Sequence, residues 1–173
     1  MGFCCSCLKP ELKGVDKVQV PQMLGSWYVV GVIPTPFEKG ACNPTEVYTW
    51  NHDTDCIDVD FHFNDRTLDG PVKSVPQKLY TGGYPDASGK WLASPIWPLK
   101  LDYTIMAVSS TYDWVVVGHR SRSFFWIMAR QPVLDQAIIQ NAMELGKAAG
   151  FDMTKIEFPE HSVAPAAPPA KGV

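Results

Sequence analysis

The most constraining feature of the sequence is a run of eight residues, 57–64, in which apolar and polar side chains alternate without a break. Successive side chains of a strand point to opposite faces, so this pattern predicts a strand with one face in a core and the other in water. The residues expected on the buried face are Ile57, Val59, Phe61 and Phe63.

Seven other short segments have the composition of strands, and turn residues separate them. Helical spacing appears only late in the chain, where Ile138, Ala142, Leu145 and Ala149 share one face. Eight regularly spaced strands and one helix predict an all-β fold, an eight-stranded antiparallel up-and-down barrel with a C-terminal α-helix packed outside. Such a barrel has no free sheet edge and can hold one small ligand. The seven segments are 27–33, 45–50, 72–81, 90–94, 103–108, 114–118 and 124–130, and 154–158 is expected to form one more short strand.

The composition is that of one folded domain. The chain has 173 residues, of which 46% are hydrophobic and 19% are charged, and this balance predicts a packed core. A net charge of −3 without clustered Lys and Arg argues against nucleic-acid binding. No run of 18 apolar residues is present, so no transmembrane helix is expected. We expect an N-terminal arm at 1–20, a barrel domain at 21–159 and a disordered Ala/Pro-rich tail at 160–173.

The cysteines and histidines have neither the spacing of a zinc site nor that of a disulfide framework, so no metal and no cofactor are predicted. Three of the five cysteines lie in the first seven residues, and Cys42 and Cys56 are expected to be free thiols. The histidines expected to lie solvated on the surface are His52, His62, His119 and His161.

The first residues, Met1-Gly2-Phe3-Cys4-Cys5-Ser6, fit the N-myristoylation motif, with Gly2 as the acceptor once Met1 is removed. One myristoyl chain binds a membrane only marginally, and palmitoylation of Cys4, Cys5 or Cys7 would supply the second signal. The sequence therefore predicts attachment to the cytoplasmic face of a membrane, with the plasma membrane as the expected one. An inert arm with chance cysteines is the alternative. Bacterial lipoprotein processing needs an apolar stretch before the cysteine, and the sequence has none.

Two motifs far apart in the chain resemble signature motifs of the lipocalin family. The first is Gly25-Ser26-Trp27-Tyr28, and the second runs from Phe125 to Arg130. Together with 94–130 and 146–156, they are most similar to plant temperature-induced lipocalins, bacterial lipocalins and apolipoprotein D, over about residues 21–159. The resemblance implies that Trp27 plugs one end of the barrel and that Arg130 covers it as a cation–π lid. Gly25 and Tyr112 belong to the same structural lid, although Ser110-Thr111-Tyr112 departs from the usual Thr-Asp-Tyr.

The resemblance also implies a ligand cavity inside the barrel. By period two, Trp126 and Met128 share the inward face of Arg130, and Tyr103 is a candidate polar group. Tyr48 and Trp50 share a face whose direction the sequence leaves open, and the direction of Glu46 is open as well. The residues expected to contact ligand are Phe37, Tyr48, Trp50, Phe61, Phe63, Trp97, Tyr103, Trp126 and Met128.

Two classes of function remain open. The first is a membrane-anchored protein, a monomer or weak dimer, that binds a fatty acid, a lysophospholipid or an oxidised lipid. The family resemblance implies lipid transport or scavenging and protection of membranes under stress. The second is a lipocalin-fold enzyme of the isomerase or de-epoxidase type, for which only Glu46 and Cys56 are candidate catalytic residues.

Overall fold

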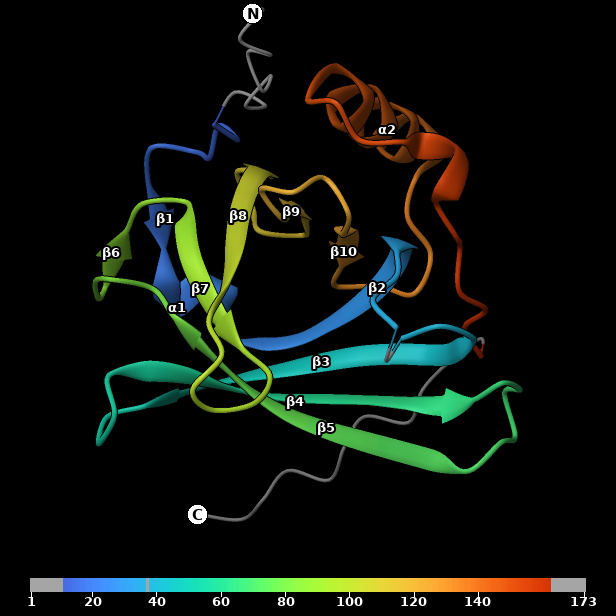
Figure 1. The fold of residues 1–173 in the computed structure, drawn as a ribbon, viewed down its shortest axis with the longest axis horizontal. Coiled ribbons are helices and arrows are strands. Elements are labelled where there is room, and N and C mark those ends of the chain that lie inside the picture. The colour runs from blue at the N-terminus through green and yellow to red at the C-terminus, as the bar shows by residue number, and fades with distance from the viewer. Residues whose placement is uncertain (1–10, 37, 163–173) are drawn as a thin grey trace, which may run out of the picture.

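The computed structural model describes residues 11–36 and 38–162, which form a closed antiparallel barrel with one long helix beside it (Figure 1). The strands follow one another around the barrel in the order β10-β2-β3-β4-β5-β7-β8-β9, so the predicted fold class is confirmed. The strands are β1 (Val18–Gln19), β2 (Gly25–Ile33), β3 (Ala41–Asn51), β4 (Cys56–Asp65), β5 (Val72–Tyr80), β6 (Asp86–Ala87), β7 (Lys90–Ser94), β8 (Leu101–Val108), β9 (Trp114–Gly118) and β10 (Phe125–Ala129). The helices are α1 (Val20–Met23), α2 (Gln136–Ala148) and the 3-10 turn η1 (Met153–Lys155).

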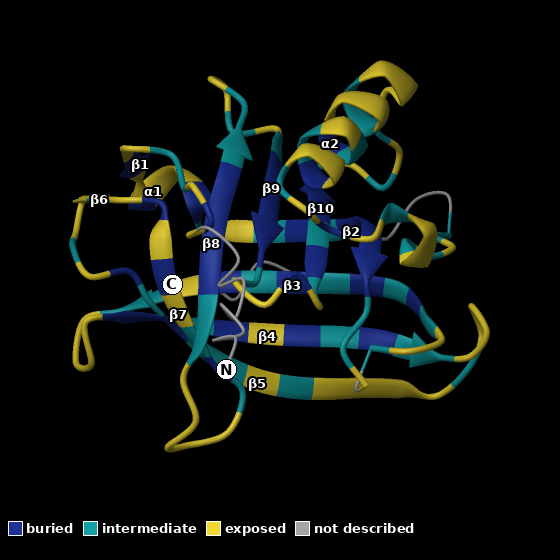
Figure 2. Cartoon of the chain, turned by 45° about the horizontal axis from the view of Figure 1, so that its top comes forward, coloured by how far each residue is buried: buried dark blue, intermediate teal, exposed yellow. Residues whose placement is uncertain are grey.

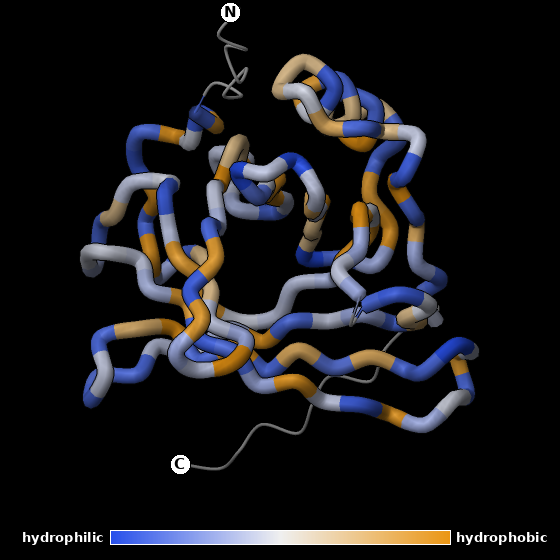
Figure 3. Tube along the Cα trace, in the orientation of Figure 1, coloured by the Kyte–Doolittle hydropathy of each residue, from blue (hydrophilic) through white to orange (hydrophobic). Residues whose placement is uncertain are grey.

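Residues 57–64, in which apolar and polar side chains alternate, form part of strand β4, as the sequence predicts. Residues Ile57 to Asn64 of β4 pair with β5, and the same strand pairs with β3 on its other side. Its four apolar side chains are all buried, which confirms their predicted face. Figure 3 shows the same alternation of hydrophobic and hydrophilic residues along neighbouring strands of the barrel.

Two apolar cores hold the fold together. One fills the barrel and includes Trp27, Tyr48 and Trp91. The other lies between the outer face of the barrel and α2 and includes Phe125 and Phe151. Figure 2 shows α2 with its buried side turned towards β10. The side chain of Asp135 caps the first turn of α2, and Gly150 follows the helix with a φ of 90°.

One end of the barrel, which we call the closed end, is covered by residues before β2. Strand β1 pairs with β6 there, and the short helix α1 lies beneath Trp27, whose Nε1 donates to the carbonyl oxygen of Met23 at 2.7 Å. Leu12, Val18 and Val20 are buried. Residues 11–20, predicted to belong to an arm, therefore pack against the barrel because their apolar side chains complete its core.

The C-terminal segment bridges a gap in the barrel wall. Strands β2 and β3 pair only through residues 25–28 and 45–48, so their other halves diverge. The backbone of Glu157 pairs with Val32, and the carbonyl oxygen of Glu160 accepts from the backbone N–H of Asn43. The strand predicted at 154–158 is thus corrected to η1 followed by a single bridge between Glu157 and Val32, because residues 153–155 form a 3-10 turn. Of the predicted tail, 160–162 is described and contacts the barrel, and 163–173 lies outside the described residues.

Candidate functional site

The closed end is sealed by Arg130 and Trp27. The guanidinium carbon of Arg130 lies 3.7 Å from the centroid of the indole ring. The same guanidinium donates hydrogen bonds to the carbonyl oxygens of Ser26, Gln22, Leu24 and Tyr112. Gly25 has a φ of 94°, a conformation that other residues rarely adopt, and this brings the chain close to the guanidinium. The geometry is that of a structural plug, in which Arg130 covers Trp27 and is bonded to the surrounding backbone.

Towards the other end, which we call the open end, the barrel encloses a cavity of about 160 Å³. Strands β3, β4, β5, β7, β8 and β10 supply its walls, and the loops after β2, β7 and β9 surround its mouth. The cavity is smaller than the roughly 300–1,000 Å³ typical of ligand sites. Its lining is Thr35, Pro36, Glu38, Glu46, Val59, Phe61, Val75, Gln77, Leu79, Ala93, Pro95, Leu99, Leu101, Asp102, Tyr103, His119, Phe124 and Trp126.

A buried carboxyl group lies at the inner end of this cavity. Glu46 is only 8% exposed, so its side chain points inward and the direction left open by the sequence is settled. Its Oε2 lies 2.5 Å from the hydroxyl of Tyr48, and that hydroxyl lies 2.7 Å from the hydroxyl of Tyr103. Burial raises the pKa of Glu46 to about 7, although the hydrogen bond from Tyr48 opposes this effect. Burial raises the pKa of both tyrosines as well, so they stay protonated at neutral pH.

A second carboxyl group, Glu38, holds the tryptophan of β10 in place. The Nε1 of Trp126 donates to Oε1 of Glu38 at 2.8 Å, and the backbone N–H of Thr35 donates to Oε2 at 2.9 Å. The indole ring of Trp126 also stacks on Tyr103, with 6.4 Å between ring centroids. The loop after β2 is therefore tied to the cavity wall through a side chain that the sequence analysis did not single out.

The structure brings part of the predicted ligand set to the cavity. Phe61, Tyr103 and Trp126 line it, and Tyr48 lies directly behind Glu46. Phe63 packs against Phe61 with 5.2 Å between ring centroids. Contact with a ligand stays a prediction for these residues and for Met128, which is buried in the barrel core.

Three other predicted residues lie away from the cavity lining or outside the described chain. Trp50 stacks on Tyr84 at 4.3 Å, near the closed end, so the structure does not bring it to the cavity. Trp97 is 76% exposed on the loop after β7, beside the cavity mouth. Phe37 lies outside the described residues, as do Gly2, Cys4, Cys5 and Cys7.

A family model described as a lipocalin-like domain matches residues 18–161, which is most of the chain. The protein belongs to the lipocalin family. It is 24% identical to temperature-induced lipocalin-1 of Arabidopsis thaliana, over 91% of this chain and 87% of that protein. It is 23% identical to the outer membrane lipoprotein Blc of Vibrio cholerae, over 89% of each chain. Among solved structures, insecticyanin from the tobacco hornworm Manduca sexta superimposes with a TM-score of 0.67 at 15% identity, over 89% of this chain and 86% of that one, a likeness of fold.

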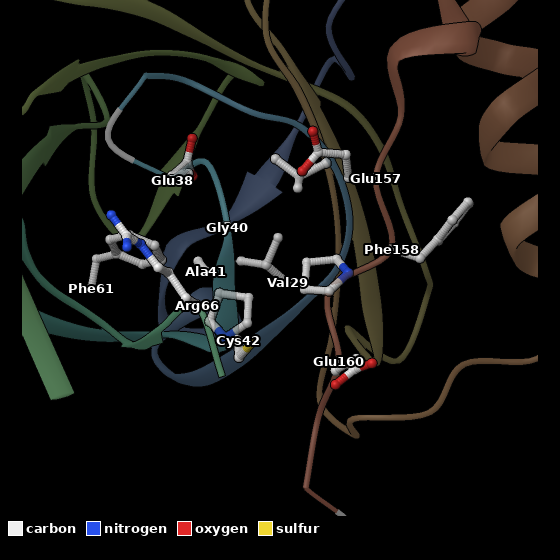
Figure 4. A pocket seen from close by; sticks show the side chains of 13 residues that line it. Val29, Glu38, Gly40, Ala41, Cys42, Phe61, Arg66, Glu157, Phe158 and Glu160 are labelled. Atoms are coloured by element: carbon white, nitrogen blue, oxygen red, sulfur yellow. The ribbon is translucent and has the colours of Figure 1, made fainter. Parts of the chain in front are cut away.

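This lipocalin has a second pocket in the barrel wall, where β2 and β3 diverge (Figure 4). Its volume is about 290 Å³, and it shares Glu38 and Phe61 with the barrel cavity. Arg66 and Cys42 lie on one side, and the C-terminal residues 157–160 form the other. We take the barrel cavity as the candidate site because its walls are mainly apolar side chains from six strands, whereas the second pocket lies in the gap between β2 and β3 and has Arg66, Glu157 and Glu160 in its lining.

The histidines of this lipocalin differ from the prediction in two cases. His119 lines the cavity, and burial lowers its pKa. His161 is partly buried under the C-terminal segment, where its ring contacts Tyr28 edge-on and its Nε2 lies 2.9 Å from the carbonyl oxygen of Val29. Both were predicted to be solvated, but tertiary packing of loops encloses them. Cys42 and Cys56 are free thiols, as predicted.

The described residues contain neither a membrane-spanning helix nor a cluster of metal ligands. In 11–36 and 38–162, no helix is long and apolar enough to cross a membrane. The same segments bring together no group of three or more His, Cys, Asp or Glu side chains that could hold a metal ion.

Proposed function

We propose that this lipocalin binds a small hydrophobic ligand of the lipid class in its barrel cavity: a fatty acid, a lysophospholipid or an oxidised lipid. The observation that carries the proposal is an enclosed space with mainly apolar walls, one open end and a few polar groups at its base. Burial of a ligand's apolar surface there contributes roughly 25 cal/mol per Å². The cavity is small, so a long chain would extend through the mouth past Leu99 and Phe124.

The second part of the proposal is attachment to a membrane through the N-terminus. Acylation of Gly2, with palmitoylation of Cys4, Cys5 or Cys7, would hold the barrel at the cytoplasmic face of the plasma membrane. The exposed Ile96, Trp97 and Leu99 lie on the loop beside the cavity mouth, and they would contact a lipid surface. Of its relatives, one is named an outer membrane lipoprotein and another temperature-induced, which supports lipid scavenging and membrane protection under stress.

Tryptophan emission tests the ligand part of the proposal. The purified chain is titrated with lysophosphatidylcholine and with a long-chain fatty acid below their micellar concentrations. We expect saturable quenching at micromolar concentrations, because Trp126 lies in the cavity wall. Ala93→Phe should abolish it by filling the cavity, whereas Ala137→Phe on the exposed face of α2 should not. Quenching that survives Ala93→Phe would refute the cavity as the site.

A separate experiment tests the membrane part. The full chain is expressed in a eukaryotic cell, and its distribution between membrane and supernatant is compared with that of Gly2→Ala. Replacement of Cys4, Cys5 and Cys7 by serine removes the second signal alone. Both variants should move to the supernatant, and a control, Cys42→Ser, should not. A wild-type chain that stays in the supernatant would contradict the proposed anchor.

One observation favours the enzyme alternative enough to test it. Glu46 is a buried carboxyl group with a pKa near neutrality, which suits a general acid or base. If the protein turned over an epoxide or an unsaturated lipid, Glu46→Gln would abolish turnover. If the protein only binds lipid, the same change would retune affinity, and incubation with the wild type would return the lipid unchanged.

A further inference from the structure

The polar groups at the base of the barrel cavity indicate which end of a lipid can reach it; this inference rests on the proposed function and narrows it. Oε1 of Glu46 makes no hydrogen bond with any described residue, and Glu46 lines the cavity. Among the described residues, only His161 Nδ1 is a fully buried side-chain nitrogen or oxygen atom without a partner, so Oε1 of Glu46 is accessible from the cavity. The base of the cavity therefore presents an acceptor that a donor group of a ligand can reach.

The tyrosine and tryptophan donors near this acceptor are already used. When Glu46 is ionised, the hydroxyl of Tyr48 donates its one proton to Oε2, so it must accept from the hydroxyl of Tyr103. The single indole N–H of Trp126 is bound to Glu38. The groups left around Glu46 are acceptors, Oε1 of Glu46 and the lone pairs of the Tyr103 oxygen, and the side-chain amide of Gln77 in the cavity lining adds an uncharged donor and acceptor.

The charges around the cavity have one sign. Among the described residues, its lining contains the carboxyl groups of Glu38, Glu46 and Asp102 and no Lys or Arg. Asp102 is paired with Arg120 at 3.0 Å, and Arg130 lies at the closed end on Trp27. Arg66 lines the second pocket rather than the cavity. A ligand carboxylate placed beside Glu46 would meet like charge in a buried site, without a cation to compensate.

We propose that the cavity selects lipids whose inner end is a hydrogen-bond donor without negative charge, a hydroxyl or an amine, and that Glu46 is the residue that receives it. The apolar chain then packs along Val59, Leu79 and Leu101 towards the mouth. Of the ligands named above, an oxidised lipid that carries a hydroxyl group fits this description with its polar end inward, and an ionised fatty acid does not.

Three ligands of equal chain length test the selection: decan-1-ol, decylamine and decanoate. Binding to the full chain is measured by calorimetry at pH 8, where Glu46 is mostly ionised. We expect decylamine and decan-1-ol to bind at least tenfold more tightly than decanoate. Glu46→Gln should remove most of the preference for decylamine over decanoate. Glu144→Gln, which removes one charge from the exposed face of α2, should retain it.

The pH dependence of the wild type gives a second readout that needs no variant. With a pKa of about 7, the ionised fraction of Glu46 rises about tenfold between pH 6 and pH 8, and the affinity for decylamine should rise by about the same factor. The other titratable groups around the cavity have little effect on this rise in affinity. Burial lowers the pKa of His119 below its usual value, and both tyrosines stay protonated. Glu38 adds a second carboxyl group at the mouth and raises the pKa of Glu46.

The outcomes separate this inference from the proposed function. Decanoate that binds as tightly as decan-1-ol, in the wild type and in Glu46→Gln alike, would overturn the inference and leave lipid binding intact. Affinity for decylamine that does not change with pH would also overturn it. If none of the three ligands binds and lysophosphatidylcholine does not bind either, the proposed function fails, and the inference fails with it.

Discussion

The buried carboxyl group of Glu46 makes a quantitative prediction about stability. Its pKa is about 7 in the folded protein against an ordinary value of 4.5, so the folded state holds the proton more tightly than the unfolded state. The stability that this proton contributes is complete below pH 4.5 and is lost as the pH rises through 7. A pKa difference of about 2.5 corresponds to about 3 kcal/mol, since one pKa unit is worth about 1.4 kcal/mol.

The substitution Glu46→Gln isolates this contribution, because the amide keeps the shape of the side chain and cannot ionise. Free energies of unfolding are measured by urea denaturation of the wild type and the variant at pH 5 and pH 8. The variant should gain about 2–3 kcal/mol relative to the wild type between these two values, because only the wild type loses stability there. Parallel stability curves for the two proteins would refute the buried, proton-holding state of Glu46.

Three further substitutions test other contacts. Arg130→Lys should lower the free energy of unfolding by about 2 kcal/mol, measured by thermal denaturation. The reason is that Lys cannot both stack on Trp27 and reach the surrounding carbonyl oxygens. An unchanged midpoint would contradict a stabilising role of Arg130 over Trp27. Gly118→Ala should cost about 1–3 kcal/mol, because its new Cβ would lie 2.6 Å from the ring of Phe151, and an unaltered urea midpoint would show that the packing there is loose. Trp97→Ser should change stability by less than about 0.5 kcal/mol and weaken binding to phosphatidylcholine vesicles; unaltered vesicle binding would remove the loop from the membrane contact.

The sequence predicts the fold correctly in segments where a single period of hydrophobic side chains dominates. In 57–64 both neighbours of the strand impose the same inward face, so alternation alone predicts which side chains are buried. Alternation does not predict which side chains are buried at the beginning of β3. The pairing of β3 with β4 shifts there between Cys42 and Thr45, and Asn43 has a φ of 50°. The packing of segments 11–20 and 157–162 could not be predicted either. Their backbone partners lie far away in the chain, and no local sequence pattern indicates these pairings.

The candidate site is predictable only in its aromatic part. Trp126 could be placed inward because it shares the period-two face of Arg130, and the structure brings it to the cavity. Glu46 could not be placed, because a charged residue on a strand usually faces water, whereas here its carboxyl group is buried and accepts a hydrogen bond from Tyr48. Glu38 lies on a loop whose course the sequence does not define, so its bond to Trp126 could be found only in the structure.

The claim on which the account depends is that the inside of the barrel receives a ligand. Calorimetric titration of the wild type and of Ala93→Phe with decan-1-ol, at two temperatures, tests it most directly. The account predicts one site per chain in the wild type, a negative heat-capacity change from buried apolar surface, and no binding to Ala93→Phe while that variant remains folded. Equal binding to both proteins would place the ligand elsewhere, and no binding to the wild type would mean that its core residues fill the barrel.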